Sequence, residues 1–140
     1  MGIAVPGSIA AKMLYPERKV LAVTGDGGFM MNCQEIETAV RMNVPIVVLV
    51  MRDDSYGLIK WKQDDRFGDH CFVDFTNPDF VKMAENMHAV GLRVDKTEDL
   101  KDVLEQAFAS GKVCIIDCPV DYAENTKLTE HLKQVIAELE

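Results

Sequence analysis

Two apolar runs that end in acidic residues constrain the fold of this chain more than any other feature. Residues 20–24 form one short run, and residues 46–51 form a second that contains no polar side chain. Short runs rich in β-branched residues are typical of buried strands in parallel sheets. The first run leads into the glycine turn 25–29, which contains Asp26, and the second leads into Arg52, Asp53 and Asp54. We expect the two acidic strand ends to be neighbours.

Strand-like and helix-like segments alternate along the whole chain. The pattern predicts strands over residues 20–24, 46–51, 90–94 and 113–118, and helices over about 6–15, 32–43, 55–63, 77–88 and 97–109. This alternation indicates βαβ units. We therefore predict an α/β fold, with three α/β/α layers around a mostly parallel sheet, as a single domain over residues 1–140.

Two asparagines are predicted to begin helices. Asn32 is followed three residues later by Glu35, and Asn77 is followed by Pro78; both patterns are typical of helix N-termini. Residues 64–76 show no period and are predicted to be a polar, mobile connection. Residues 126–140 carry a weak apolar period, which in isolation would fray and in a larger protein would pack on a neighbour.

The glycine turn and the acids predict a phosphate site that uses a metal. In open α/β sheets, ligands bind beyond the carboxyl ends of the strands, and a glycine turn offers backbone N–H groups to an anion. Asp26 and Asp53 would repel each other and any phosphate. A Mg²⁺ ion between carboxylate and phosphate oxygens removes this conflict.

The arrangement resembles the thiamine diphosphate motif, in which GDG is followed, after a spacer of similar length, by Asn-Asn. Here Gly25-Asp26-Gly27 precedes Asp53, which lies 27 positions after Asp26. The segment 1–11 (MGIAVPGSIAA) also resembles the M-G-x-x-x-P-x-x-I-G-A helix start of that family, and the segment 34–39 (QEIETA) resembles its Q-E-L-x-T-A helix. The resemblance is to the C-terminal, diphosphate-binding domain of the acetolactate synthase and pyruvate oxidase group, whose full chains are several times longer. It implies that this chain is a fragment of a longer enzyme.

One departure points to a branch of the group. Most members have Asn-Asn where this chain has Arg52-Asp53. An Asp at the metal-binding position, together with Asp121-Tyr122, resembles the catabolic, flavin-independent acetolactate synthases. The change keeps a side-chain oxygen for the metal and adds a negative charge.

The resemblance implies specific roles for residues of the site. Mg²⁺ would be held by the Asp26 and Asp53 side chains and by the backbone carbonyl of Ser55, whose side chain is expected to matter little. Met1 would lie under the aminopyrimidine ring of the cofactor. The expected cofactor-binding residues are Met1, Gly25, Asp26, Gly27, Gly28, Asp53, Ser55, Tyr56, Gly57, Leu58 and Ile59. Core contacts of a short helix are the alternative interpretation of residues 56–59.

The implied reaction is the decarboxylation of pyruvate, or a related 2-oxoacid, and carboligation to 2-acetolactate. The activating glutamate lies in the pyrimidine-binding domain of a partner subunit, so we expect no catalytic residue here, no activity from this chain alone, and a homo-oligomer. The alternatives are another 2-oxoacid decarboxylase or oxidase of the family, a noncatalytic receiver-like domain, and a noncatalytic partner-binding domain.

Composition excludes several other classes of function. The net charge is −8, and no basic cluster with interleaved aromatic residues occurs, which argues against a nucleic-acid partner. No apolar run approaches the roughly 20 residues of a membrane span, and nothing resembles a signal peptide. We therefore expect no membrane association and a cytoplasmic protein. The four cysteines lack C-x-x-C spacing, so we predict neither zinc nor a redox role.

Overall fold

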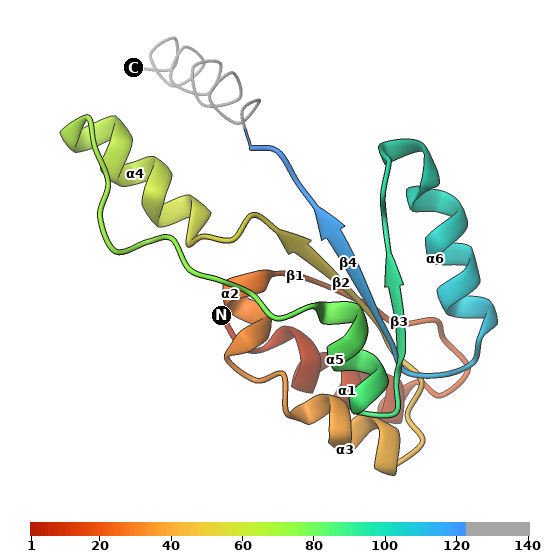
Figure 1. Ribbon diagram of the computed structural model, residues 1–140. Coiled ribbons are helices and arrows are strands. Elements are labelled where there is room, and N and C mark those ends of the chain that lie inside the picture. The colour runs from red at the N-terminus through yellow and green to blue at the C-terminus, as the bar shows by residue number, and fades with distance from the viewer. Residues whose placement is uncertain (123–140) are drawn as a thin grey trace, which may run out of the picture.

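A four-stranded, all-parallel sheet organises the protein (Figure 1). The computed structural model describes residues 1–122, so the predicted apolar tail at 126–140 lies outside the described residues. The strand order is β1-β2-β4-β3. The strands are β1 (Leu21–Gly25), β2 (Val47–Arg52), β3 (Val90–Arg93) and β4 (Cys114–Pro119).

Helices cover both faces of this sheet. They are α1 (Ala4–Leu14), α2 (Asp26–Met30), α3 (Glu35–Arg41), α4 (Gly57–Phe67), α5 (Phe80–Asn86) and α6 (Leu100–Ala109), with a 3-10 turn, η1 (Thr97–Asp99), before α6. Within residues 1–122, no helix has both the length and the apolar character needed to cross a bilayer. The prediction of three α/β/α layers is confirmed.

Side-chain alternation along β2 explains the two cores. Val48 and Val50 pack on one face, in a cluster with residues of α1, α2, α3 and α5. Val47 and Leu49 pack on the other face, in a cluster with Ala107 of α6. Because successive side chains of a strand point to opposite faces, a continuous apolar run fits a strand that is covered on both sides.

The strand register brings three carboxyl ends to one edge. Met51 of β2 pairs with Gly25 of β1 on one side and with Cys118 of β4 on the other. The residues that follow these strands are therefore neighbours, as the sequence predicts for the first two.

Three local predictions were wrong. The glycine turn is itself helical, since α2 begins at Asp26. Asn32 does not cap α3, which begins at Glu35, because its amide donates to the Gly2 carbonyl at 2.8 Å. Asn77 does not cap α5 either. The cap is Asp79, whose carboxylate accepts from two backbone N–H groups of the first turn, those of Val81 and Lys82, at 3.1 and 3.2 Å.

Helix α4 is longer than predicted and extends away from the sheet (Figure 1). It ends at Phe67, where Gly68 adopts a φ of 73°, and the chain then returns along residues 69–76. The Tyr56 N–H donates to the Val73 carbonyl at 2.8 Å, and the Phe75 N–H donates to the Asp54 carbonyl at 3.0 Å. The return segment is thus paired with the start of α4, although its predicted mobility stays a prediction.

Gly91 provides a test of the packing of α5 on β3. A Cβ added to Gly91 would overlap the Val81 carbonyl of α5, so Gly91→Ala should lower the free energy of unfolding by about 1–3 kcal/mol. Gly7, in the exposed part of α1, has room for a Cβ, and Gly7→Ala should raise it by about 0.5–1 kcal/mol. Urea unfolding of both variants checks this; equal effects of the two substitutions would contradict the close contact.

Candidate functional site

A cavity of about 940 Å³ opens beyond the carboxyl ends of β1, β2 and β4. Every cofactor-binding residue expected from the sequence lines this one cavity: Met1, Gly25, Asp26, Gly27, Gly28, Asp53, Ser55, Tyr56, Gly57, Leu58 and Ile59. The same cavity is also lined by Thr24, Lys60, Trp61, Asp64, Val120, Asp121 and Tyr122. Residues from distant parts of the sequence therefore share one binding space.

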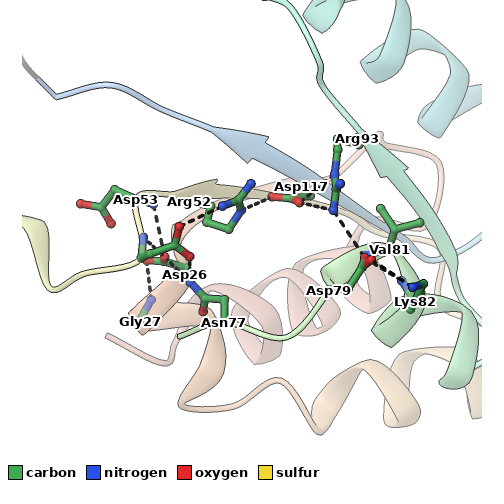
Figure 2. A network of polar contacts seen from close by, with 11 residues as sticks. Asp26, Gly27, Arg52, Asp53, Asn77, Asp79, Val81, Lys82, Arg93 and Asp117 are labelled. Atoms are coloured by element: carbon green, nitrogen blue, oxygen red, sulfur yellow. Dashed lines mark hydrogen bonds and ion pairs between the residues drawn. The ribbon is translucent and has the colours of Figure 1, made fainter. Parts of the chain in front are cut away.

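Asp26 is the most constrained residue of the site. Its side chain is buried at the start of α2, and its carboxylate accepts four hydrogen bonds (Figure 2). The Gly27 N–H donates to Oδ1 at 2.8 Å. Oδ2 accepts from the N–H groups of Asp53 and Asp54 at 3.2 and 2.8 Å, and from Asn77 Nδ2 at 2.7 Å. Donors on three segments thus fix this carboxylate.

A left-handed residue creates the pair of backbone donors. Asp54 has a φ of 57°, which is uncommon for a residue other than glycine. Its side chain is held by Asn77 Nδ2 at 2.8 Å and by Arg52 Nη1 at 2.9 Å. Strained backbone of this kind is kept where surrounding contacts enforce it, often at functional sites.

Asp53 lies beside Asp26 in a tight space. Burial raises the pKa of Asp53, and the negative charge of Asp26 raises it further, whereas a hydrogen bond from Ser55 Oγ to Oδ2 at 3.0 Å opposes the rise. A Cβ on Gly57 would overlap Asp53 Oδ2, and a Cβ on Gly27 would lie 2.9 Å from the Tyr56 ring. Glycine at both positions leaves room for these groups, and the Ser55 side chain orients Asp53, which the sequence did not predict.

The donor set fits a hard cation. None of the ion pairs within residues 1–122 involves Asp26 or Asp53. Lys60, which lines the same cavity, interacts with the charge of Asp53 but forms its ion pair with Asp74. In the same part of the chain, no three His, Cys, Asp or Glu side chains gather as a metal site. A cation here would therefore take two carboxylates and complete its shell with backbone, phosphate or water oxygens, as Mg²⁺ commonly does.

The Ser55 carbonyl is suitably free to be such an oxygen. Ser55 pairs with Asp74 in an isolated antiparallel bridge, whose hydrogen bonds are made by the backbone groups of residues 54 and 56. In this arrangement the carbonyl of the central residue points away from the return segment. No backbone N–H group of the described residues donates a hydrogen bond to this carbonyl.

An ion-pair network supports the site from behind (Figure 2). Asp117 of β4 is buried, with a side chain 1% exposed, between Arg52 Nε at 2.9 Å and Arg93 Nη2 at 2.9 Å. The Asp117 carboxylate raises the pKa of Arg52. Arg93 also reaches Asp79, the cap of α5, at 3.4 Å. Arg52, which replaces the first Asn of the family motif, thus joins β2 to β4 rather than facing the cavity.

Among the residues that the sequence did not assign to the site are those that follow β4, and Asn77. Val120, Asp121 and Tyr122 follow β4 and line the cavity, and the rule that ligands bind beyond strand carboxyl ends would have found them. Burial raises the pKa of Tyr122, and the charges of Asp53 and Asp26 raise it further. Asn77 was predicted to cap a helix, but its side chain holds Asp26 instead. The local sequence does not distinguish the two roles, because Asp79, two residues later, is equally suited to cap the helix.

Comparison with known proteins agrees with this geometry. The family model described as "Thiamine pyrophosphate enzyme, C-terminal TPP binding domain" matches residues 1–118. The acetolactate synthase of Bacillus subtilis (strain 168) is 43% identical over 128 residues, which cover 91% of this chain and 22% of that protein. The pyruvate oxidase of Lactiplantibacillus plantarum is 44% identical over 110 residues, which cover 78% of this chain and 18% of that protein.

A catabolic relative matches almost the whole chain. The catabolic acetolactate synthase of Raoultella terrigena is 34% identical over 138 residues, which cover 97% of this chain and 25% of that protein. The chain therefore spans between a fifth and a quarter of the length of the acetolactate synthases that it matches here.

Asp79 gives the network a testable pH dependence. Hydrogen bonding from the Lys82 N–H lowers the pKa of Asp79, and the charges of Arg93 and Lys82 lower it further. A carboxylate whose pKa is lowered on folding adds stability above its unfolded pKa, and this stability is lost as the pH falls through the folded pKa. Asp79→Ala should therefore have a lower melting temperature than the wild type at pH 7, and the difference should narrow below about pH 3.9. Asp79→Asn keeps a side-chain acceptor, so its melting temperature at pH 7 should fall less than that of Asp79→Ala.

Thermal melts of the three proteins from pH 7 to pH 2 test this expectation. A gap between wild type and Asp79→Ala that is the same at every pH would show that the charge of Asp79 contributes nothing to folding.

Proposed function

Because this chain belongs to the thiamine pyrophosphate enzyme family, as its C-terminal TPP-binding domain, we propose that it anchors the diphosphate of thiamine diphosphate through Mg²⁺. The observation that carries the proposal is the pair of carboxylates, Asp26 and Asp53, that share a cavity and form no ion pair among the described residues. A divalent cation would neutralise both, and would also hold the diphosphate.

The residues of the cavity divide into three groups. The Asp26 and Asp53 carboxylates and the Ser55 carbonyl are the proposed ligands of Mg²⁺. The glycines Gly25, Gly27 and Gly28 leave space for the backbone to approach the diphosphate. The apolar wall for the rings of the cofactor would come from Met1, Tyr56, Leu58 and Ile59, with Gly57 beside them, all of which line the cavity.

The proposed reaction is that of an acetolactate synthase, acting on pyruvate or a related 2-oxoacid. Bound thiamine diphosphate would supply carbanion stabilisation, while this chain supplies binding and orientation. Asp53 and the pair Asp121-Tyr122 support the catabolic branch, and both relatives named as acetolactate synthases support the reaction. The similarity to a pyruvate oxidase keeps an oxidative 2-oxoacid decarboxylase as the second candidate.

A partner domain completes the proposed enzyme. Met1, Leu58 and Ile59, on the cavity wall, are 74%, 63% and 48% exposed, and an apolar patch of this kind suits a protein interface. We assign the covering surface to a pyrimidine-binding domain of the same or a second subunit of a cytoplasmic homo-oligomer. That domain would carry the activating glutamate, so this chain alone binds cofactor without turnover.

Cofactor binding tests the proposal directly. Trp61, the single tryptophan, lines the cavity, so its fluorescence should report binding of thiamine diphosphate in the presence of Mg²⁺ and lose the response on addition of EDTA. Asp26→Asn removes a charged oxygen ligand and Asp53→Ala removes the ligand oxygen altogether, so each should weaken binding at least about tenfold. Asp102→Asn, an exposed change of the same type on α6, should bind like the wild type.

Two results would contradict the proposal. One is equal binding by Asp26→Asn and Asp102→Asn. The other is labelling of Asp26 or Asp53 by acetyl phosphate without any affinity for thiamine diphosphate, which would favour the receiver-like alternative.

A further inference from the structure

We propose that Asn77 is a positioning residue for the cation-binding carboxylate of Asp26, which it holds so that Oδ1 alone is left for the cation. The inference rests on the proposed function of the site. It concerns a residue outside the cavity lining, and it assigns distinct roles to the two oxygens of Asp26.

The hydrogen bonds of Asp26 divide unequally between its two oxygens. Oδ2 accepts three donors, Asn77 Nδ2 and the N–H groups of Asp53 and Asp54, at 2.7–3.2 Å. A carboxylate oxygen has two lone pairs, so Oδ2 has no capacity left. Oδ1 accepts one donor, the Gly27 N–H at 2.8 Å, and keeps one lone pair for a ligand.

The amide of Asn77 has one acceptable orientation. Its Nδ2 lies 2.7 Å from Asp26 Oδ2 (Figure 2). The same nitrogen lies 2.8 Å from Asp54 Oδ1. A reversed amide would place its oxygen against two carboxylate oxygens, with no hydrogen between them. Asn77 therefore bridges two acidic side chains that would otherwise repel each other.

This orientation leaves a buried oxygen without a partner. Among the buried side-chain nitrogen and oxygen atoms of the described residues, Asn77 Oδ1 is the one without a hydrogen-bond partner. A buried unpaired acceptor is destabilising, and such groups need a specific explanation. The explanation here is that the two bonds from Nδ2 to carboxylates fix the amide, and fixing Asp26 takes precedence over satisfying the Asn77 oxygen.

The ion-pair network contacts Asp54 and the segment that carries Asn77. Asp54, one acceptor of the Asn77 amide, is bound by Arg52, which in turn binds Asp117. Asp117 also binds Arg93, and Arg93 reaches Asp79, two residues after Asn77, at the start of α5. Asn77 thus precedes α5, whose cap Asp79 belongs to the network, while Asp54 follows β2, so the network links the segment of Asn77 to one of its two acceptors.

Residues that orient a metal ligand without contacting the metal commonly change metal affinity by 10–100-fold when they are removed. We expect Asn77→Ala and Asn77→Leu to weaken Mg²⁺-dependent binding of thiamine diphosphate at least about tenfold, by Trp61 fluorescence. Leucine has the same branched arrangement of side-chain heavy atoms as asparagine, without its donor, so it also serves if the alanine variant fails to fold. Asn86→Ala, an exposed change at the end of α5, is the matched control.

A second readout needs no cofactor. The amide N–H resonances of residues 27, 53 and 54 report the hydrogen bonds to Asp26. In ¹H–¹⁵N spectra of the cation-free protein, both Asn77 variants should shift these three resonances, whereas Asn86→Ala should leave them unchanged. If Asn77 acted in folding alone, its variants would lower the melting temperature but leave these three resonances in place.

The outcomes separate this inference from the proposed function. If the wild type binds the cofactor with Mg²⁺ and the Asn77 variants bind equally well, the positioning role is wrong and the proposed function stands. If the wild type shows no binding, the proposed function fails and the inference fails with it. Weakened binding together with shifted amide resonances supports the inference.

Discussion

The site depends on one buried carboxylate that is held from three directions. Asp26 follows β1, its backbone donors follow β2, and its side-chain donor precedes α5. Hydrogen bonds to a charged acceptor are stronger than those between neutral groups, and inside a protein such bonds also exclude alternative geometries. The parallel sheet contributes by aligning the strand ends, so that short hydrogen bonds can join segments far apart in the chain.

The same arrangement creates an electrostatic conflict that a ligand resolves. Two carboxylates face one cavity, and burial together with the neighbouring charge raises the pKa of Asp53. Behind them, the carboxylate of Asp117 forms ion pairs with two arginines. An acidic side chain with a structural role is therefore neutralised by the protein itself. Asp26 and Asp53 form no ion pair within residues 1–122, which is consistent with a site that binds a cation.

The sequence predicted the strands well because their signal is local. The apolar run before Arg52 corresponds to a strand covered on both faces, and the acidic residues after it lie where a parallel sheet places them. The eleven expected site residues also line one cavity. The family resemblance supplied that set, whereas the glycine turn and the acids alone indicated only a phosphate site with a metal.

The rest depends on contacts between distant residues. Arg52 and Asp117 are 65 positions apart, and nothing near either residue indicates their pairing. Asn77 and Asp79 both suit a helix start, and the choice is made by tertiary contacts, because the Asn77 amide is drawn to Asp26 and Asp54. Local propensity is therefore overridden at the position that serves the site.

Locating the cation tests the central claim most directly. In crystals of the chain grown with thiamine diphosphate and Mn²⁺ in place of Mg²⁺, anomalous diffraction should show one peak bonded to Asp26 Oδ1, the Asp53 carboxylate and the Ser55 carbonyl. The three hydrogen bonds to Asp26 Oδ2 should persist in that structure. A peak that avoids Asp26 and Asp53, or that contacts Asp26 through Oδ2 with those bonds broken, would contradict the account.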